Sequence, residues 1–230
     1  MQFKKVLIFT VCFMIGGFAV DLFASETNNY KNRLILGGRL NALDTTSEYN
    51  EDDYKIANNI ELEDIGVSFE LNAKYKIYFN KAEQNSFFIT PEVFYSFGSV
   101  KSDDAKFTLG EYYLKIAPSY GAKISLGYEL KNKHAFSVGL GFQNISYKYE
   151  HFYRGIGYVR DDDTLAGLFS FEYEYNINNH LVFNFGFTCS YFEFRTPDSV
   201  YVSSNGFTIG TINKINNTIF IAGVGLGYRF

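Results

Sequence analysis

Ten charged residues sit inside otherwise apolar, alternating stretches of the sequence. They are Arg39, Glu70, Lys74, Glu92, Lys115, Lys123, Glu129, Glu172, Glu174 and Arg229. Five are basic and five are acidic, so they could pair with one another in an enclosed interior. An unpaired charge away from water is costly, and this favours a paired network over the alternative, a proton or ion path.

The segments that carry these charges alternate with a period of two, which predicts strands. In "IGVSFELNAKYKIYF" (65–79), apolar residues from Ile65 to Ile77 occupy one face, while Glu70, Lys74 and Lys76 occupy the other. Seven further segments behave similarly: 33–43, 87–98, 114–130, 136–149, 165–177, 181–194 and 219–230. A bilayer crossing takes about 9–11 tilted residues, so these lengths suit membrane-spanning strands.

Three places are predicted to be irregular. Pro91 and Pro118 lie within candidate strands and should each mark a bulge or a local break in the ladder. The fifth segment should slip in register near Asn144, so that Ile145, Tyr147 and Tyr149 continue the outward face. In the fourth segment the same alternation places Ile116 outward, with Lys115 and Ser119 inward.

The connections between the segments alternate in length. "NKAEQN", "KNKH" and "NNH" are short, whereas residues 43–64, 99–112, 150–164 and 195–217 form long predicted loops. Short turns on one side and long loops on the other are typical of outer-membrane barrels. The last loop contains a predicted hairpin turning at Asn205-Gly206, which should stand above the membrane. The alternative is that residues 199–212 add two strands and make ten.

The first 24 residues are predicted to be a secretory signal peptide. Lys4 and Lys5 precede a largely apolar run from Val6 to Val20, and Ala24 offers a cleavage site. Residues 25–230 would form the barrel domain. Cleavage would remove two of 21 basic and one of 25 acidic residues and leave a net charge of −5. That charge argues against nucleic acid as a partner, because such binding depends on Lys and Arg at phosphates.

The chain resembles the small outer-membrane barrels of Gram-negative bacteria, of the OmpA-like, OmpX-like and opacity-like group. The stretches "ITPEVFYSFG", "IAPSYGAKISLGYEL" and "AGVGLGYRF" carry the resemblance. It is also similar, more loosely, to surface antigens of intracellular bacteria. The resemblance implies that a terminal aromatic residue is recognised by the barrel-assembly machinery. Tyr228 and Phe230 would form this C-terminal assembly signal.

We therefore predict an all-β fold, an eight-stranded antiparallel up-and-down transmembrane barrel in the bacterial outer membrane. Its expected role is structural, with adhesion or host interaction through four extracellular loops. Expected partners are outer-membrane lipid or lipopolysaccharide, the assembly machinery and a host-surface protein. A small porin is the alternative, and a lipid-modifying enzyme is a weaker one.

We predict no enzymatic activity, no cofactor and no metal site. The patterns of the lipid A palmitoyltransferase and deacylase are not recognisable, and only His151, near Ser146 and Glu150, lies on the predicted outer side. His134 and His180 fall at short turns on the opposite side. The acidic run in residues 44–64 and "RDDD" at 160–163 lack the spacing of a calcium loop and are interpreted as solvated.

Overall fold

The computed structural model describes residues 32–51, 60–79, 85–107, 110–131, 133–153, 156–195, 203–204, 207–208 and 212–230. The predicted signal peptide lies outside these residues. The strands are β1 (Arg33–Glu51), β2 (Ile60–Tyr78), β3 (Asn85–Phe107), β4 (Gly110–Leu130), β5 (His134–Tyr153), β6 (Ile156–Asn176), β7 (Leu181–Arg195), β8 (Ser203–Ser204), β9 (Phe207–Thr208) and β10 (Ile212–Arg229). No helix in the described part of the chain is long and apolar enough to cross a membrane.

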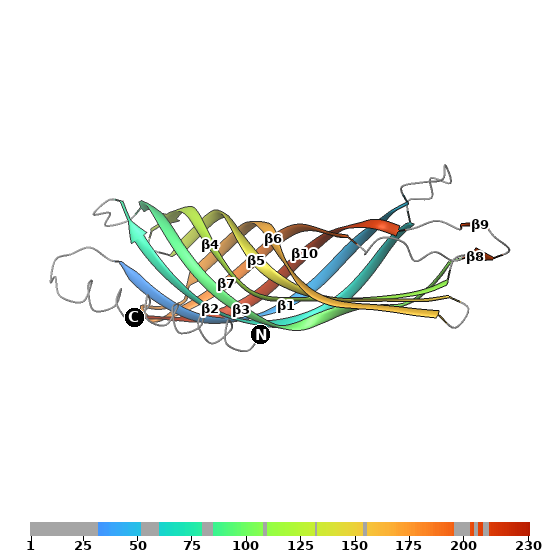
Figure 1. Ribbon diagram of the computed structural model, residues 1–230. Helices are drawn as coiled ribbons and strands as arrows, with labels where there is room; N and C mark the ends of the chain where they lie inside the picture. Colours follow the sequence, from blue (N-terminus) through green and yellow to red (C-terminus); the bar gives the residue numbers. More distant parts are fainter. Residues whose placement is uncertain are drawn as a thin grey trace, which may run out of the picture.

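Eight of these strands close into an antiparallel barrel in the order β1-β10-β7-β6-β5-β4-β3-β2 (Figure 1). Consecutive barrel strands pair with each other, and β1 completes the ring by pairing with β10. The prediction of an eight-stranded up-and-down barrel is confirmed. The short strands β8 and β9 pair only with each other, so this hairpin adds no strand to the barrel, also as predicted.

The outer wall of the barrel carries an apolar belt, which we call the lipid-facing band. Its side chains come from residues 34–42, 65–77, 87–97, 120–130, 136–142, 165–175, 181–191 and 220–230. Leu140 is 70% exposed, and Ile65, Val67 and Leu226 also point away from the barrel. Most of these stretches match the roughly 9–11 tilted residues that cross a bilayer. The band therefore has the height expected of a lipid-embedded wall.

Beyond the band, the polarity of the wall reverses while the strands continue. On β5, Gln143, Ile145, Tyr147 and Tyr149 are all buried in unbroken alternation, and Ile145 is 0% exposed. The predicted register slip near Asn144 is therefore wrong. Above the lipid, water replaces hydrocarbon outside the barrel, so apolar side chains turn inward without any change in strand parity.

The bulge lies on β4 instead, beside Pro118. Pro118 pairs with Ile145 and Gly121 pairs with Gln143, so two β4 residues face one residue of β5. This extra residue shifts the parity of β4. Ile116 is consequently buried and Lys115 points outward, opposite to both predictions.

Pro91 has a milder effect than Pro118. The β2–β3 pairing is interrupted between Lys74–Glu92 and Ile77–Ile89, but the register is the same on both sides of the gap. A proline lacks the backbone N–H that would donate a hydrogen bond to the neighbouring strand, so the pairing of β2 with β3 is interrupted beside Pro91. The prediction that each proline marks a bulge or a break is confirmed.

The predicted long loops are in large part strand, which corrects the expectation of extended loops at 43–64, 99–112 and 150–164. β3 and β4 pair as far as Phe107–Gly110, and β5 and β6 as far as Tyr153–Ile156. These strands were not predicted, because the prediction required an apolar outer face and the apolar face at this level is the inner one. The strands thus form hairpins that extend well past the lipid-facing band.

These extensions separate into two sheets (Figure 1). In the described part of the chain, β2–β3 pairing ends at Val67–Ser99 and β6–β7 pairing ends at Gly167–Tyr191. The outer parts of β3, β4, β5 and β6 form one unit, called here the first outer sheet. Those of β7, β10, β1 and β2 form the second outer sheet.

Candidate functional site

Glu172 of β6 is the centre of the ion pairs inside the barrel. Its carboxylate lies 3.2 Å from Arg39, 2.6 Å from Lys74 and 2.5 Å from Lys123, which project from β1, β2 and β4. Glu70 holds the other side of the Arg39 guanidinium at 2.9 Å. All five side chains are nearly inaccessible to solvent. One carboxylate therefore ties three distant strands together across the lumen.

Two further carboxylates complete this group. Glu92 lies 3.4 Å from Lys123 and 3.6 Å from Lys74, and Glu174 lies 3.2 Å from Lys74. The inward-facing sides of β2, β3, β4 and β6 thus meet in a single cluster. The structure brings together seven of the ten charged residues selected from the sequence at this level.

A second group of charges lies nearer the end of the barrel at which β1 begins and β10 ends. Glu129 is 3.1 Å from Arg33 and 3.4 Å from Lys76, and it accepts a 2.7 Å hydrogen bond from the Tyr78 hydroxyl. Lys76 joins the two groups through Glu174 at 2.5 Å. Arg33 and Lys76 were absent from the predicted set, although Lys76 already stood on the inward face of its segment by parity. The combined interior charge network contains five cations and five carboxylates.

Glycines of the facing strands make room for Arg39. A Cβ atom at Gly186 would lie 2.1 Å from the Arg39 guanidinium, and one at Gly223 would lie 2.9 Å from Arg39 Cγ. These contacts explain the small inner face of the last strand. Among the alternating glycines of "AGVGLGYRF", Gly223 leaves room for this buried arginine.

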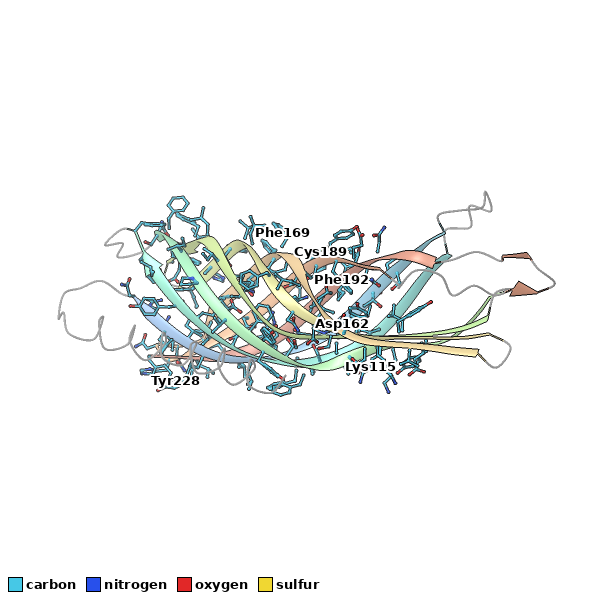
Figure 2. All side chains as sticks on the ribbon, in the orientation of Figure 1. Lys115, Asp162, Phe169, Cys189, Phe192 and Tyr228 are labelled. Carbon is cyan, nitrogen blue, oxygen red and sulfur yellow. The ribbon has the colours of Figure 1, made fainter. Side chains whose placement is uncertain are left out.

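An apolar cluster fills the interior on the far side of the charge network. Its members are Leu43, Val100, Leu114, Ile116, Ile145, Tyr147, Tyr149, Ala166, Phe192, Ile219 and Ile221. They come from both outer sheets, and Figure 2 shows Phe192 between the two. A neutral hydrogen bond of 2.8 Å from Gln143 to Ser190 lies between the two levels. The described interior is thus occupied first by ion pairs and then by packed apolar side chains.

Four predicted site residues lie outside these two levels. Lys115 is on the outer surface, for the reason given above. Arg229 faces inward but donates hydrogen bonds to the carbonyls of Asn178 and Asn179 at 3.2 and 2.8 Å, so it holds a turn. Tyr228 is exposed at the end opposite Lys115 (Figure 2), and the ring of Phe230, also exposed, lies 4.9 Å from the Tyr228 ring. Their recognition by an assembly machinery stays a prediction.

The described histidines have structural contacts. His134 Nδ1 lies 2.9 Å from the Tyr173 hydroxyl, and the His180 ring stacks on Tyr228 at 5.5 Å. The side chain of His151 is not among those described. Within the described residues, no three His, Cys, Asp or Glu side chains gather as possible metal ligands.

A closed antiparallel barrel with an apolar, aromatic outer belt and a polar interior is the architecture of bacterial outer-membrane proteins. This chain is such a barrel, located in the outer membrane. No protein-family model matches its sequence, and no curated protein does.

Solved structures with a similar arrangement are barrels of Gram-negative bacteria. The attachment invasion locus protein Ail of Yersinia pestis is 16% identical, with a TM-score of 0.39, over 84% of this chain and 98% of Ail. The outer membrane protease OmpT of Escherichia coli is 11% identical, with a TM-score of 0.46, over 89% and 99%. OprG of Pseudomonas aeruginosa is 13% identical, with a TM-score of 0.41, over 87% and 97%. Their activities differ, so the function of this chain has to be argued from its own geometry.

Proposed function

We propose that this protein is a surface-display barrel that attaches the bacterium to a host-surface protein through the tips of its outer sheets. The observation that carries the proposal is the continuation of the strands beyond the lipid-facing band. The β7–β10 connection, residues 196–211, is the longest between barrel strands and is the segment we assign to attachment. Binding residues occur preferentially on loops that a rigid scaffold positions.

The reach of the strands supports this role. On β5, ten residues from Asn144 to Tyr153 lie past the band. At about 3.4 Å per residue and a tilt of about 40°, they rise roughly 26 Å. The headgroup region on one side of a bilayer is only about 5–8 Å thick. The strand ends therefore stand clear of the headgroups.

The apolar cluster between the two outer sheets also supports the attachment role. The apolar cluster joins side chains of both outer sheets, so these sheets pack against each other as the two layers of a soluble domain would. A packed core limits the movement of the strands that carry the connecting segments. The extension is thus suited to hold a binding segment in a defined position.

The porin alternative fits the interior less well. Glu172 pairs across the lumen with Arg39, Lys74 and Lys123, and the apolar cluster lies beyond them. Eight strands leave an interior that side chains fill. Both features argue against an open aqueous path through the described part of the barrel.

Attachment can be tested by replacing residues 196–211 with a two-residue Asn-Gly turn. The last β7–β10 pair before this segment, Arg195–Lys214, is retained, so the barrel should still close. We expect bacteria that display the variant to attach to cultured host cells at least tenfold less, at the level of bacteria lacking the protein. The measurement is the number of attached bacteria per host cell.

The matched control places the same turn at the other end of the barrel, in place of residues 80–84 between β2 and β3. This control should attach as well as the native protein. Undiminished attachment by a folded 196–211 variant would contradict the proposal.

A further inference from the structure

Three lysines form a row across the outer face of the first outer sheet. Lys101 of β3 pairs with Lys115 of β4, and Lys115 pairs in turn with Lys148 of β5. Each points outward, because its strand neighbours Val100, Ile116 and Tyr147 are buried. Paired strands lie about 4.8 Å apart, so three cationic side chains emerge side by side.

Such a row is unfavourable in isolation, because like charges directly opposite each other destabilise a sheet. Lys148 forms an ion pair with Glu150, and this hydrogen bond raises the pKa of the Lys148 ammonium. Asp161 pairs in register with Lys148 and ends the row on β6. In the part of the chain that the structure describes, Lys101 and Lys115 have no ion-pair partner. Among the described residues, the positive charge without an ion-pair partner is therefore that of Lys101 on β3 and Lys115 on β4.

The height of the row indicates what it faces. Lys101 lies four residues beyond Phe97, Lys115 five beyond Tyr120 and Lys148 six beyond Phe142. With about 3.4 Å per residue and a tilt of about 40°, the row stands roughly 10–15 Å above the lipid-facing band. That is higher than the headgroup region of a phospholipid, which is about 5–8 Å thick. An anion bound here would sit above ordinary lipid phosphates.

Below the row, the same three strands continue into the lipid-facing band. Tyr95, Phe97, Tyr120 and Phe142 lie on the outer face of the same three strands. Figure 2 shows Lys115 on the outside of the sheet, at the far end from Tyr228. A single ligand could therefore rest its acyl chains on the aromatic wall and reach the lysines with its headgroup. This requires a headgroup larger than that of a phospholipid and negatively charged.

We propose that Lys101, Lys115 and Lys148 bind the phosphorylated saccharide headgroup of lipopolysaccharide in the outer leaflet. The phosphates neutralise the row, and the acyl chains of the same molecule lie against the aromatic wall beneath it. The site goes beyond the attachment role, because it concerns the lipid around the barrel and uses a different surface.

The test uses the double variant Lys101→Gln/Lys115→Gln of the full-length barrel in uncharged detergent micelles. A lysine near an anionic lipid surface contributes about fivefold to affinity, so the variant should bind lipopolysaccharide about thirtyfold more weakly than the native protein. The native protein should lose a similar factor with dephosphorylated lipopolysaccharide. Titration of lipid, followed by native mass spectrometry, gives both affinities, after circular dichroism has shown that each barrel is folded.

The matched control is Lys131→Gln/Lys133→Gln, which removes the same charge at the opposite end of the barrel. It should bind like the native protein. The proposal is overturned if the row variant binds normally, if the control loses as much affinity as the row variant, or if dephosphorylated lipid binds the native protein undiminished. The last comparison needs no variant and holds even if the row variant fails to fold.

Discussion

Replacing Glu172 by Gln should lower the free energy of unfolding by about 3–5 kcal/mol, because it leaves buried cations without their shared carboxylate. Arg39, Lys74 and Lys123 all lie within 3.2 Å of this group. The amide is the same size as the carboxylate, so the loss would reflect charge rather than a cavity. Urea titration in lipid vesicles, followed by the circular dichroism of the strands, measures the change.

The control for this prediction is Glu150→Gln, outside the lipid-facing band. Glu150 pairs with Lys148 at the surface, where an ion pair is worth about 0–1 kcal/mol. An equal effect of the two substitutions would show that Glu172 is not the centre of a buried network. A small effect at both positions would show the same.

The reversal of wall polarity predicts a second large effect, on β10. Ile219 is 0% exposed within the apolar cluster, whereas the adjacent Thr218 points outward beyond the lipid-facing band. Ile219→Asp would bury an uncompensated charge and should destabilise the barrel by about 3 kcal/mol or more. Thr218→Asp places the same charge at the polar edge of the band and should change stability by about 1 kcal/mol or less.

The same urea titration compares these two variants. If the band extended to this level, Thr218 would face hydrocarbon and its aspartate variant would be the damaging one. That result would contradict the reversal of wall polarity at this level.

Within the lipid-facing band, the sequence was sufficient to predict the fold. The parity of residues 65–79, 165–177 and 181–191 places the correct side chains outside, because lipid on one side and a polar lumen on the other make the two faces unlike. The expectation of eight strands follows from counting such segments. Arg33 was missed because it begins its strand, where alternation gives little guidance.

Outside the band, the same pattern misled the prediction. Ile145, Tyr147 and Tyr149 were placed outward on the assumption that apolar always means lipid-facing, although water surrounds the barrel at that level. Lys115 was misplaced for a different reason. Its side depends on a one-residue bulge beside Pro118, and the sequence suggests such a bulge without giving its effect on parity.

The central claim is that the strands cross the outer membrane and continue into water on the outer side. Labelling of single cysteines in intact cells with a membrane-impermeant maleimide tests it most directly, in a Cys189→Ser background. Ser146→Cys, on the outer sheet, should be labelled in intact cells, and Lys133→Cys, at the other end, only after the cells are broken. Leu140→Cys, inside the lipid-facing band, should resist the reagent in both. Labelling of Lys133→Cys but not Ser146→Cys in intact cells would contradict the account.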